Sequence, residues 1–222
     1  MDSTEFARSE PDRSIAEDPA DACGMIIVVD DDPLVRASLD SLFRSVGYAT
    51  RLYPSAREAL GEPWPDRLMC VVTDVRMPDI GGFELQASLA SRNAEIPIVF
   101  MTGHGDIPMT VRAMKAGAVD FLSKPFRDQD MLDAVSAAMD RGRVDREVER
   151  GNAHAQSLYD GLTPREREVM RGVVRGQLNK QIAGDLGIAE ITVKLHRSNV
   201  MRKMGVRRVP DLVRLAGSIS DR

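Results

Sequence analysis

The sequence predicts an α/β domain built on a doubly wound parallel sheet of five strands, followed by a smaller all-helical domain. Three observations lead to this prediction. Up to about residue 140, five short apolar stretches alternate with segments of helical periodicity, the pattern of a parallel sheet covered on both faces. After residue 122 no strand pattern occurs. At Thr163 the sequence Thr-Pro-Arg-Glu combines a capping box with Pro at the first helical position, which marks a new helix start.

The strands and helices of the first domain follow one another from residue 25. We expect strands at 25–29, 48–53, 69–73, 96–101 and 118–122. We expect helices between Pro33 and Gly47, from about Ser55, and over 83–90, 107–116 and 128–140. Residues 25–142 are therefore predicted to form one domain. Residues 1–24 carry seven acidic residues without hydrophobic periodicity and are predicted to be a disordered acidic tail.

The second domain, residues 161–222, is predicted to contain helices only. Glycines at 176, 187 and 205 separate helices expected over 164–175, 179–186, 190–204 and 209–216. Residues 143–160 are polar and carry charges at helical spacing. We interpret them as a linker that could extend the preceding helix.

Composition excludes several classes of protein. Hydrophobic residues make up 43% and charged residues 29% of the chain, as in soluble globular proteins. The apolar runs are too short to cross a bilayer, and the N-terminus lacks the pattern of a secretory signal. The two cysteines, Cys23 and Cys70, provide neither a disulfide framework nor metal-site spacing. We therefore expect a cytoplasmic protein that does not associate with membranes.

Charge is distributed unevenly along the chain. Residues 1–140 contain 24 acidic and 13 basic residues, a net charge of −11, whereas residues 141–222 contain 10 acidic and 17 basic residues, a net charge of +7. This asymmetry indicates two domains with different partners. The basic domain is the candidate for binding nucleic acid.

Distinctive polar residues follow four of the predicted strands: Asp30 and Asp31, Asp74, Thr102, and Lys124. The ends of parallel strands converge at one edge of the sheet, so we expect these residues to share a pocket. Clustered carboxylates need a cation, and oxygen ligands suit Mg²⁺. Asp74 could then attack phosphorus as a carboxylate nucleophile, while Lys124 and Thr102 contact phosphoryl oxygens. For Asp74 taken alone, capping of the next turn is the alternative interpretation.

Residues 180–193 have the spacing of a helix-turn-helix. Ala183 allows the second helix to approach closely, Gly187 forms the turn and Val193 packs inward. The second helix would then expose polar and basic side chains: Thr192, Lys194, Arg197, Ser198, Arg202 and Lys203. A basic face is usually only a solvated face. After this turn, and in a basic segment, it is predicted to lie in the DNA major groove.

Three segments of the first domain are especially distinctive: VVDDDP, TDVRMPDIGGFEL and MTGHGDIPMTVRAMKAGAVDFLSKPF. With their spacing they resemble the CheY-like receiver domain of bacterial two-component response regulators, over about residues 25–142. The resemblance implies that a sensor histidine kinase phosphorylates Asp74, and that Asp30, Asp31 and Asp74 hold Mg²⁺. Asp32 is not among these metal-binding residues, and we expect it to cap the start of the first helix rather than to bind metal.

The same resemblance assigns roles to further residues of the pocket. Thr102 and Lys124 match the switch hydroxyl and the lysine of the family, and Phe121 matches the aromatic residue that changes rotamer with the threonine. Arg76 and His104 occupy positions that tune the lifetime of the acyl phosphate in the family. For His104, an exposed loop histidine is the alternative.

The second domain contains the run LTPREREVMRGVVRGQLNKQIAGDLGIAEITVKLHRSNVMRKMGVRRVPDLVRLA. It resembles the LuxR-type four-helix DNA-binding domain over about residues 162–216. Together with TGHGD and MKAGAVDF in the first domain, it is similar to the FixJ-type branch of the NarL/FixJ family. The resemblance implies base contacts from Lys194, Leu195 and Ser198. It also implies phosphate contacts, which position the helix without reading sequence, from Lys180, Thr192, Arg197 and Arg202.

By this resemblance, the protein is a response regulator and not an enzyme beyond the phosphoryl chemistry at Asp74. Phosphorylation is expected to produce a homodimer through the 105–123 surface. The dimer would bind two half-sites of promoter DNA about one helical turn apart, and would activate transcription with RNA polymerase as a partner.

Two alternatives stay open. The first is a Mg²⁺-dependent phosphatase that works through an aspartyl phosphate. Such enzymes generally place a second Asp two residues after the nucleophile, where this chain has Arg76. The second is a phosphorylation-independent DNA-binding regulator in which the receiver is a protein-interaction module.

Overall fold

A computed structural model describes residues 24–92, 96–103 and 107–219. By its internal contacts the chain divides into two compact units, Met1–Val144 and Asp145–Arg222. Nearly all of the predicted acidic tail, and His104, lie outside the described residues. Within the described ranges, no helix is both long enough and apolar enough to cross a membrane.

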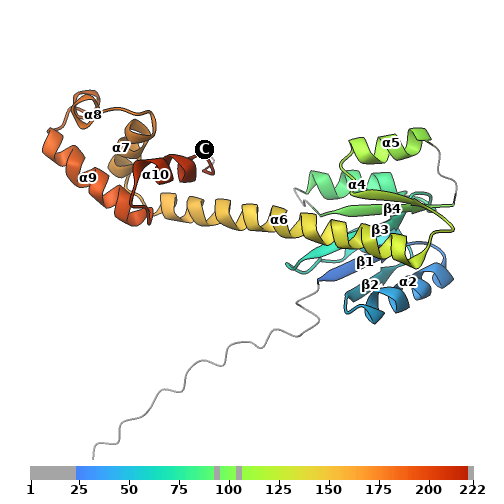
Figure 1. Ribbon diagram of the computed structural model, residues 1–222. Coiled ribbons are helices and arrows are strands. Elements are labelled where there is room, and N and C mark those ends of the chain that lie inside the picture. Colours follow the sequence, from blue (N-terminus) through green and yellow to red (C-terminus); the bar gives the residue numbers. More distant parts are fainter. Residues whose placement is uncertain (1–23, 93–95, 104–106, 220–222) are drawn as a thin grey trace, which may run out of the picture. The chain divides into compact units, whose positions relative to one another are not determined.

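The first unit contains a parallel sheet of five strands (Figure 1). The strands are β1 (Met25–Val29), β2 (Ala49–Tyr53), β3 (Met69–Asp74), β4 (Ile98–Thr102) and β5 (Asp120–Ser123). They are arranged in the order β2-β1-β3-β4-β5, with parallel pairing between neighbours. This confirms the predicted doubly wound α/β fold. β4 begins two residues later than predicted, after Pro97, whose missing N–H cannot join a sheet ladder.

Helices cover both faces of this sheet. They are α2 (Pro33–Ser45), α3 (Ala56–Gly61), α4 (Gly82–Ser91), α5 (Ile107–Lys115) and the first part of α6 (Asp128–Asp160). Alternate residues of β1 point to opposite faces: Ile26 and Val28 pack with α2 and α6, whereas Ile27 and Val29 pack with α3, α4 and α5. Asp32 caps α2 as predicted, because its Oδ1 accepts a hydrogen bond of 2.8 Å from the N–H of Leu34.

The helix α6 continues beyond residue 140, where the first-domain helix is predicted to end, and reaches Asp160. The linker 143–160 therefore extends the preceding helix, as its sequence allows. The helical spacing of charges gives a local reason: Arg143 Nη1 lies 2.5 Å from Oδ1 of Asp140, one turn earlier.

The described part of the second unit contains helices and no strands, as predicted. After α6 come α7 (Pro164–Val174), α8 (Asn179–Leu186), α9 (Glu190–Lys203) and α10 (Val209–Ala216). Thr163 and Glu166 form the predicted capping box. The N–H of Glu166 donates to Oγ1 of Thr163 at 3.3 Å, and the N–H of Thr163 donates to Oε2 of Glu166 at 2.9 Å. Gly187 ends α8 with φ +63°, in the left-handed region that favours glycine. Val193 of α9 is fully buried between the helices, which confirms the helix-turn-helix packing.

Candidate functional site

The carboxyl ends of four strands bring the predicted polar residues to one edge of the sheet. The register of β1 and β3 pairs Val29 with Thr73, so Asp30, which follows β1, comes level with Asp74, the last residue of β3. Thr102 is the last residue of β4, and Lys124 follows β5 directly. Asp30, Asp74 and Thr102 are buried, whereas Asp31 is exposed. Residues separated by up to about a hundred positions in the sequence therefore share one site, as the topology predicts.

Lys124 joins two of the carboxylates. Its Nζ donates to Oδ2 of Asp30 at 2.6 Å and to Oδ2 of Asp74 at 2.9 Å. The other carboxylate oxygens accept backbone hydrogen bonds: Asp30 from the N–H of Asp32 at 2.8 Å, and Asp74 from the N–H of Arg76 at 3.1 Å. These contacts fix the orientation of both carboxylates, and the Lys124–Pro125 peptide bond is cis.

Burial and charge pairing act in opposite directions on the pKa values of this site. Burial raises the pKa of Asp30, and the hydrogen bonds from Lys124 and from the Asp32 N–H only partly offset it. Burial lowers the pKa of Lys124, but the hydrogen bonds to Asp30 and Asp74 outweigh it, so this pKa lies above its ordinary value. A further cation near Asp30 would therefore favour its ionised form.

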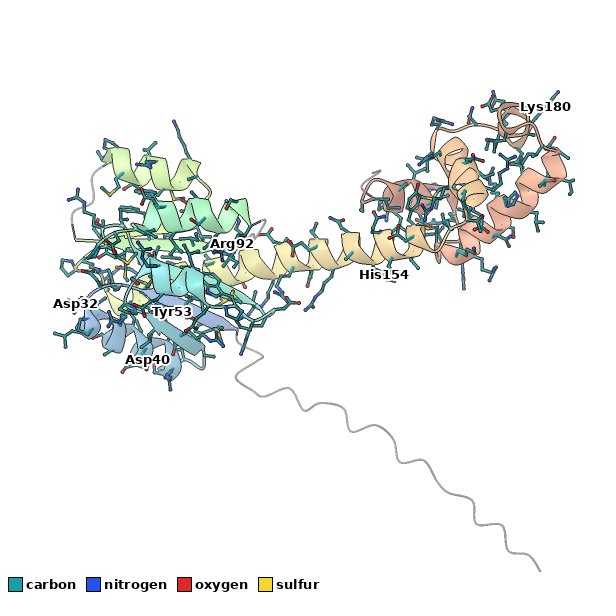
Figure 2. All side chains as sticks on the ribbon, turned by 180° about the vertical axis from the view of Figure 1, so that it is seen from behind. Asp32, Asp40, Tyr53, Arg92, His154 and Lys180 are labelled. Carbon is teal, nitrogen blue, oxygen red and sulfur yellow. The ribbon has the colours of Figure 1, made fainter. Side chains whose placement is uncertain are left out.

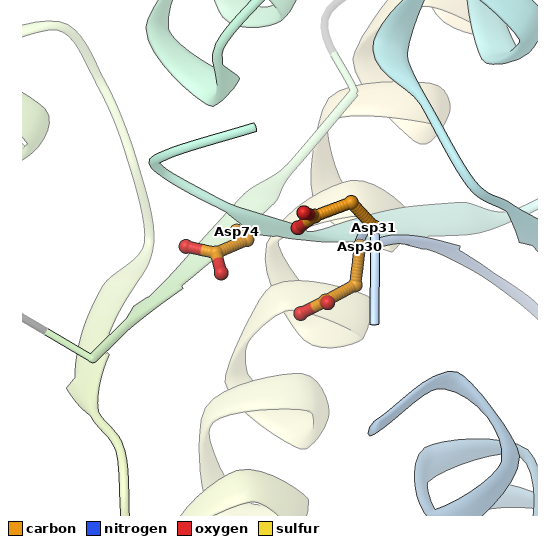
Figure 3. Close-up of side chains that lie close together, drawn as sticks. All are labelled: Asp30, Asp31 and Asp74. Carbon is orange, nitrogen blue, oxygen red and sulfur yellow. The ribbon is translucent and has the colours of Figure 1, made fainter. Parts of the chain in front are cut away.

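Asp30, Asp31 and Asp74 form the cluster expected for a metal site. One carboxylate oxygen from each lies within 4.8 Å of the others, and Figure 3 shows the three side chains next to one another at the strand ends. Three carboxylates against the single ammonium group of Lys124 leave two negative charges, which a divalent cation would balance. Because the donors are all oxygens, the residues present fit Mg²⁺.

Thr102 lies at the end of β4, next to this cluster, whereas Phe121 lies further back on β5, where it pairs with Phe100 of β4. The N–H of Lys124 donates to the carbonyl oxygen of Thr102 at 2.7 Å, which ties the ends of β4 and β5 together. The Phe121 ring centroid lies 6.4 Å from that of the buried Phe100, which in turn lies 5.0 Å from that of Phe83 on α4. A rotamer change at Phe121 would thus alter contacts that continue to α4.

Gly82 begins α4 directly against the backbone of Asp74. A Cβ atom added to Gly82 would lie 2.5 Å from the carbonyl oxygen of Asp74 and 2.9 Å from Cε1 of Phe100. Both distances are shorter than van der Waals contact. Glycine at this position therefore lets α4 approach the end of β3, a requirement that the sequence alone did not reveal.

We expect Gly82→Ala to destabilise the first unit by about 2 kcal/mol, because the added methyl group overpacks a buried contact. Urea unfolding followed by the fluorescence of Trp64, the only tryptophan of the chain, measures this effect. The matched control is Gly61→Ala in α3, where a Cβ would meet nothing within 4 Å. Equal losses in the two variants would contradict the steric explanation.

The predicted DNA-contact residues lie on α8 and α9 of the second unit. Five are exposed: Lys180, which Figure 2 labels, and Lys194, Leu195, Ser198 and Arg202. The other two, Thr192 and Arg197, are half-buried, so their predicted full exposure was wrong; Arg197 donates to Asn179 of α8 instead of extending into solvent. An exposed Leu195 (62%) between cationic side chains suits apolar contact with a base edge.

Lys203 does not belong to this exposed face. Its Nζ lies 2.7 Å from Oε2 of the buried Glu166 and 3.3 Å from the carbonyl oxygen of Gly161. The hydrogen bond from Lys203 is the main cause that lowers the pKa of Glu166, against the effect of burial. The predicted exposure of Lys203 was therefore wrong, because helical spacing does not reveal a carboxylate 37 positions earlier in the chain.

Comparisons with known families match both units. Residues 26–136 match the response regulator receiver domain, and residues 160–216 match the bacterial regulatory proteins of the luxR family. Nodulation protein W of Bradyrhizobium diazoefficiens is 54% identical over 195 residues, which cover 88% of this chain and 86% of that protein. The chain belongs to the NarL/FixJ family of response regulators.

Further relatives agree with this family assignment. The transcriptional regulatory protein FixJ of Azorhizobium caulinodans is 45% identical over 189 residues, covering 85% of this chain and 90% of that protein. Among solved structures, the response regulator StyR matches with a TM-score of 0.77 and 46% identity over 87% of this chain and 98% of that one. Full-length FixJ from B. japonicum matches with a TM-score of 0.52 and 39% identity, over 88% and 96%. This NarL/FixJ protein is thus a two-component transcriptional regulator with a receiver and a LuxR-type DNA-binding domain, as predicted.

Proposed function

We propose that Asp74 is the phosphoacceptor of this response regulator and that a sensor histidine kinase supplies the phosphoryl group. The observation that carries the proposal is the contact of Lys124 with both Asp30 and Asp74, next to the third carboxylate of Asp31. In this assignment residues 25–142 are the phosphoacceptor domain, 143–160 the linker and 161–222 the DNA-binding domain.

Each side chain of the site has a separate role in the phosphoryl transfer. An oxygen of Asp74 attacks phosphorus, a bond forms between them, and the bond from phosphorus to the kinase imidazole breaks with the electron pair going to the imidazole nitrogen. Lys124 then exchanges its contact with Asp74 for one with a phosphoryl oxygen, and the Thr102 hydroxyl donates to another. Asp30, Asp31 and Asp74 would hold Mg²⁺, which supplies charge neutralisation of the phosphoryl oxygens. Beyond this transfer and the hydrolysis of its own acyl phosphate, we assign no enzymatic activity.

A groove of about 310 Å³ beside Lys124 supports the assignment of a kinase as the partner. It lies between α2 and the residues after β5, and most of its lining is apolar: Leu34, Val35, Leu39, Leu42, Pro125 and Phe126. Leu34 is 75% exposed at this groove. We assign the groove to the apolar face of a kinase helix that brings its phosphohistidine to the Asp74 edge.

The proposed dimer uses the 105–123 surface, of which residues 107–123 are described. On α5, Ile107, Val111 and Met114 are 81%, 45% and 46% exposed, and their spacing places them on one face of the helix. Pairing of two such faces in the phosphorylated protein would remove this apolar surface from water. The dimer would then place two copies of α9 on promoter half-sites in the bacterial cytoplasm, and we propose activation through RNA polymerase as the result.

Sedimentation velocity of the full chain with Mg²⁺, before and after addition of acetyl phosphate, tests this function. We expect a shift from monomer to dimer that accompanies acyl-phosphate formation. A phosphorylated protein that stays monomeric, or an unphosphorylated protein that is already dimeric, would favour the phosphorylation-independent regulator. Multiple turnover of acetyl phosphate with no change in assembly would favour the phosphatase.

A further inference from the structure

Two cationic side chains of α9, those of Lys194 and Arg197, have acceptors of different charge. Lys194 Nζ lies 3.4 Å from the carboxylate of Glu190, so an acid partly neutralises its charge. Arg197, by contrast, donates from Nη1 to the side-chain Oδ1 of Asn179 at 3.0 Å. Within the part of the chain that the structure describes, no carboxylate pairs with Arg197.

An amide acceptor has a different effect from a carboxylate. It fixes the direction of one guanidinium N–H but carries no net charge, so the positive charge of Arg197 is retained. A guanidinium has five N–H donors in a planar fork, and the contact with Asn179 uses one of them. The remaining donors and the full charge stay available for an anionic ligand.

The position of the contact in the fold adds to this argument. Asn179 is the first residue of α8, and Arg197 lies in the middle of α9, so the hydrogen bond spans the two helices of the helix-turn-helix. Both side chains are half-buried, which restricts the rotamers of Arg197 before any ligand arrives. An arginine that is ordered in advance loses less conformational entropy on binding.

We propose that Asn179 is a positioning residue that presents Arg197 to a DNA phosphate, preordered and with its charge intact. This inference rests on the proposed DNA-binding face and adds a residue that the sequence patterns did not identify. Asn179 matters here because it is neutral. An acid at the same position would hold Arg197 at least as well but would cancel the charge that the phosphate needs.

Substitutions at Asn179 separate this role from a purely structural one. We expect Asn179→Asp to weaken binding of a fluorescein-labelled mixed-sequence DNA duplex by about tenfold, and Asn179→Ala by about threefold. In the Asp variant the slope of log affinity against log salt should fall by about one unit, because one phosphate contact loses its charge. If the contact only joined α8 to α9, Asp would preserve binding and Ala would be the more damaging change. That order would overturn the proposal.

A double-mutant cycle in the full chain completes the test. In an Arg197→Ala background, Asn179→Ala should have no further effect on DNA affinity, because Asn179 acts through Arg197. Arg202→Ala is the matched control: it removes a different cation of α9, an exposed one, and its effect should be the same whether Asn179 is intact or replaced by alanine. If Arg202→Ala weakens DNA binding while the Asn179 variants do not, the role of Asn179 is wrong but the proposed DNA-binding face is supported. If neither Arg197→Ala nor Arg202→Ala weakens DNA binding, the role of Asn179 and the proposed DNA-binding face are both wrong. Thermal unfolding of each variant verifies that the second unit is folded.

Discussion

Asp74→Asn is expected to abolish phosphorylation of the protein by acetyl phosphate or by a kinase. An amide oxygen carries no negative charge and is a poor nucleophile, so the bond to phosphorus does not form. The substitution preserves shape, and its amide oxygen can still accept the hydrogen bond that the Arg76 N–H donates at 3.1 Å. Intact-mass spectrometry after incubation with Mg²⁺ and acetyl phosphate measures the result directly.

The matched control for this variant is Asp79→Asn. Asp79 is an exposed acid in the turn after β3, and its φ of 65° is a conformation that Asn tolerates. This control should be phosphorylated like the original protein. Chelation of Mg²⁺ should stop phosphorylation of the original protein and of Asp79→Asn. Without the metal, the single charge of Lys124 does not compensate the three carboxylates and the incoming phosphoryl group. Labelling of Asp74→Asn would show that another residue accepts the phosphoryl group.

The parts of the fold that the sequence predicts are those determined by local patterns. The apolar run ending at Asp74, the Asp32 cap and the Thr163–Glu166 capping box each depend on residues a few positions apart. The convergence of Asp30, Asp74 and Lys124 is long-range, but it follows from a topological rule, because parallel strands place their carboxyl ends at one edge. These features could therefore be predicted without coordinates.

Other features depend on distances that no local pattern encodes. The hydrogen bond from Arg197 to Asn179 joins residues 18 positions apart in the sequence. The close approach of Gly82 to Asp74 depends on where α4 packs. The cis bond at Pro125 also could not be predicted, because only about 5% of such bonds are cis in folded proteins.

Lys203, which the sequence predicts to be exposed, instead forms an ion pair with the buried Glu166. We expect Lys203→Met to destabilise the second unit by about 3 kcal/mol at neutral pH, because it leaves the Glu166 carboxylate buried without its cation. Hydrogen exchange of peptides from α7 and α9 in increasing denaturant measures this loss. The matched control is Lys194→Met, whose exposed pair with Glu190 is separated by 3.4 Å and should contribute less than about 0.5 kcal/mol.

The pH dependence of the same variant follows from the sign of the Glu166 shift. In the folded protein the hydrogen bond from Lys203 is the largest influence on this pKa and holds it below its ordinary value of 4.5. A lowered carboxyl pKa favours folding above the ordinary value, and this stabilisation is lost as the pH falls through the folded-state value. Lys203→Met removes that influence, so its difference from the original protein should be full at neutral pH and should shrink once Glu166 is protonated. A loss of stability that is independent of pH would mean that Lys203 acts through the packing of its aliphatic stem, and equal losses for the Lys203 and Lys194 variants would contradict a buried ion pair.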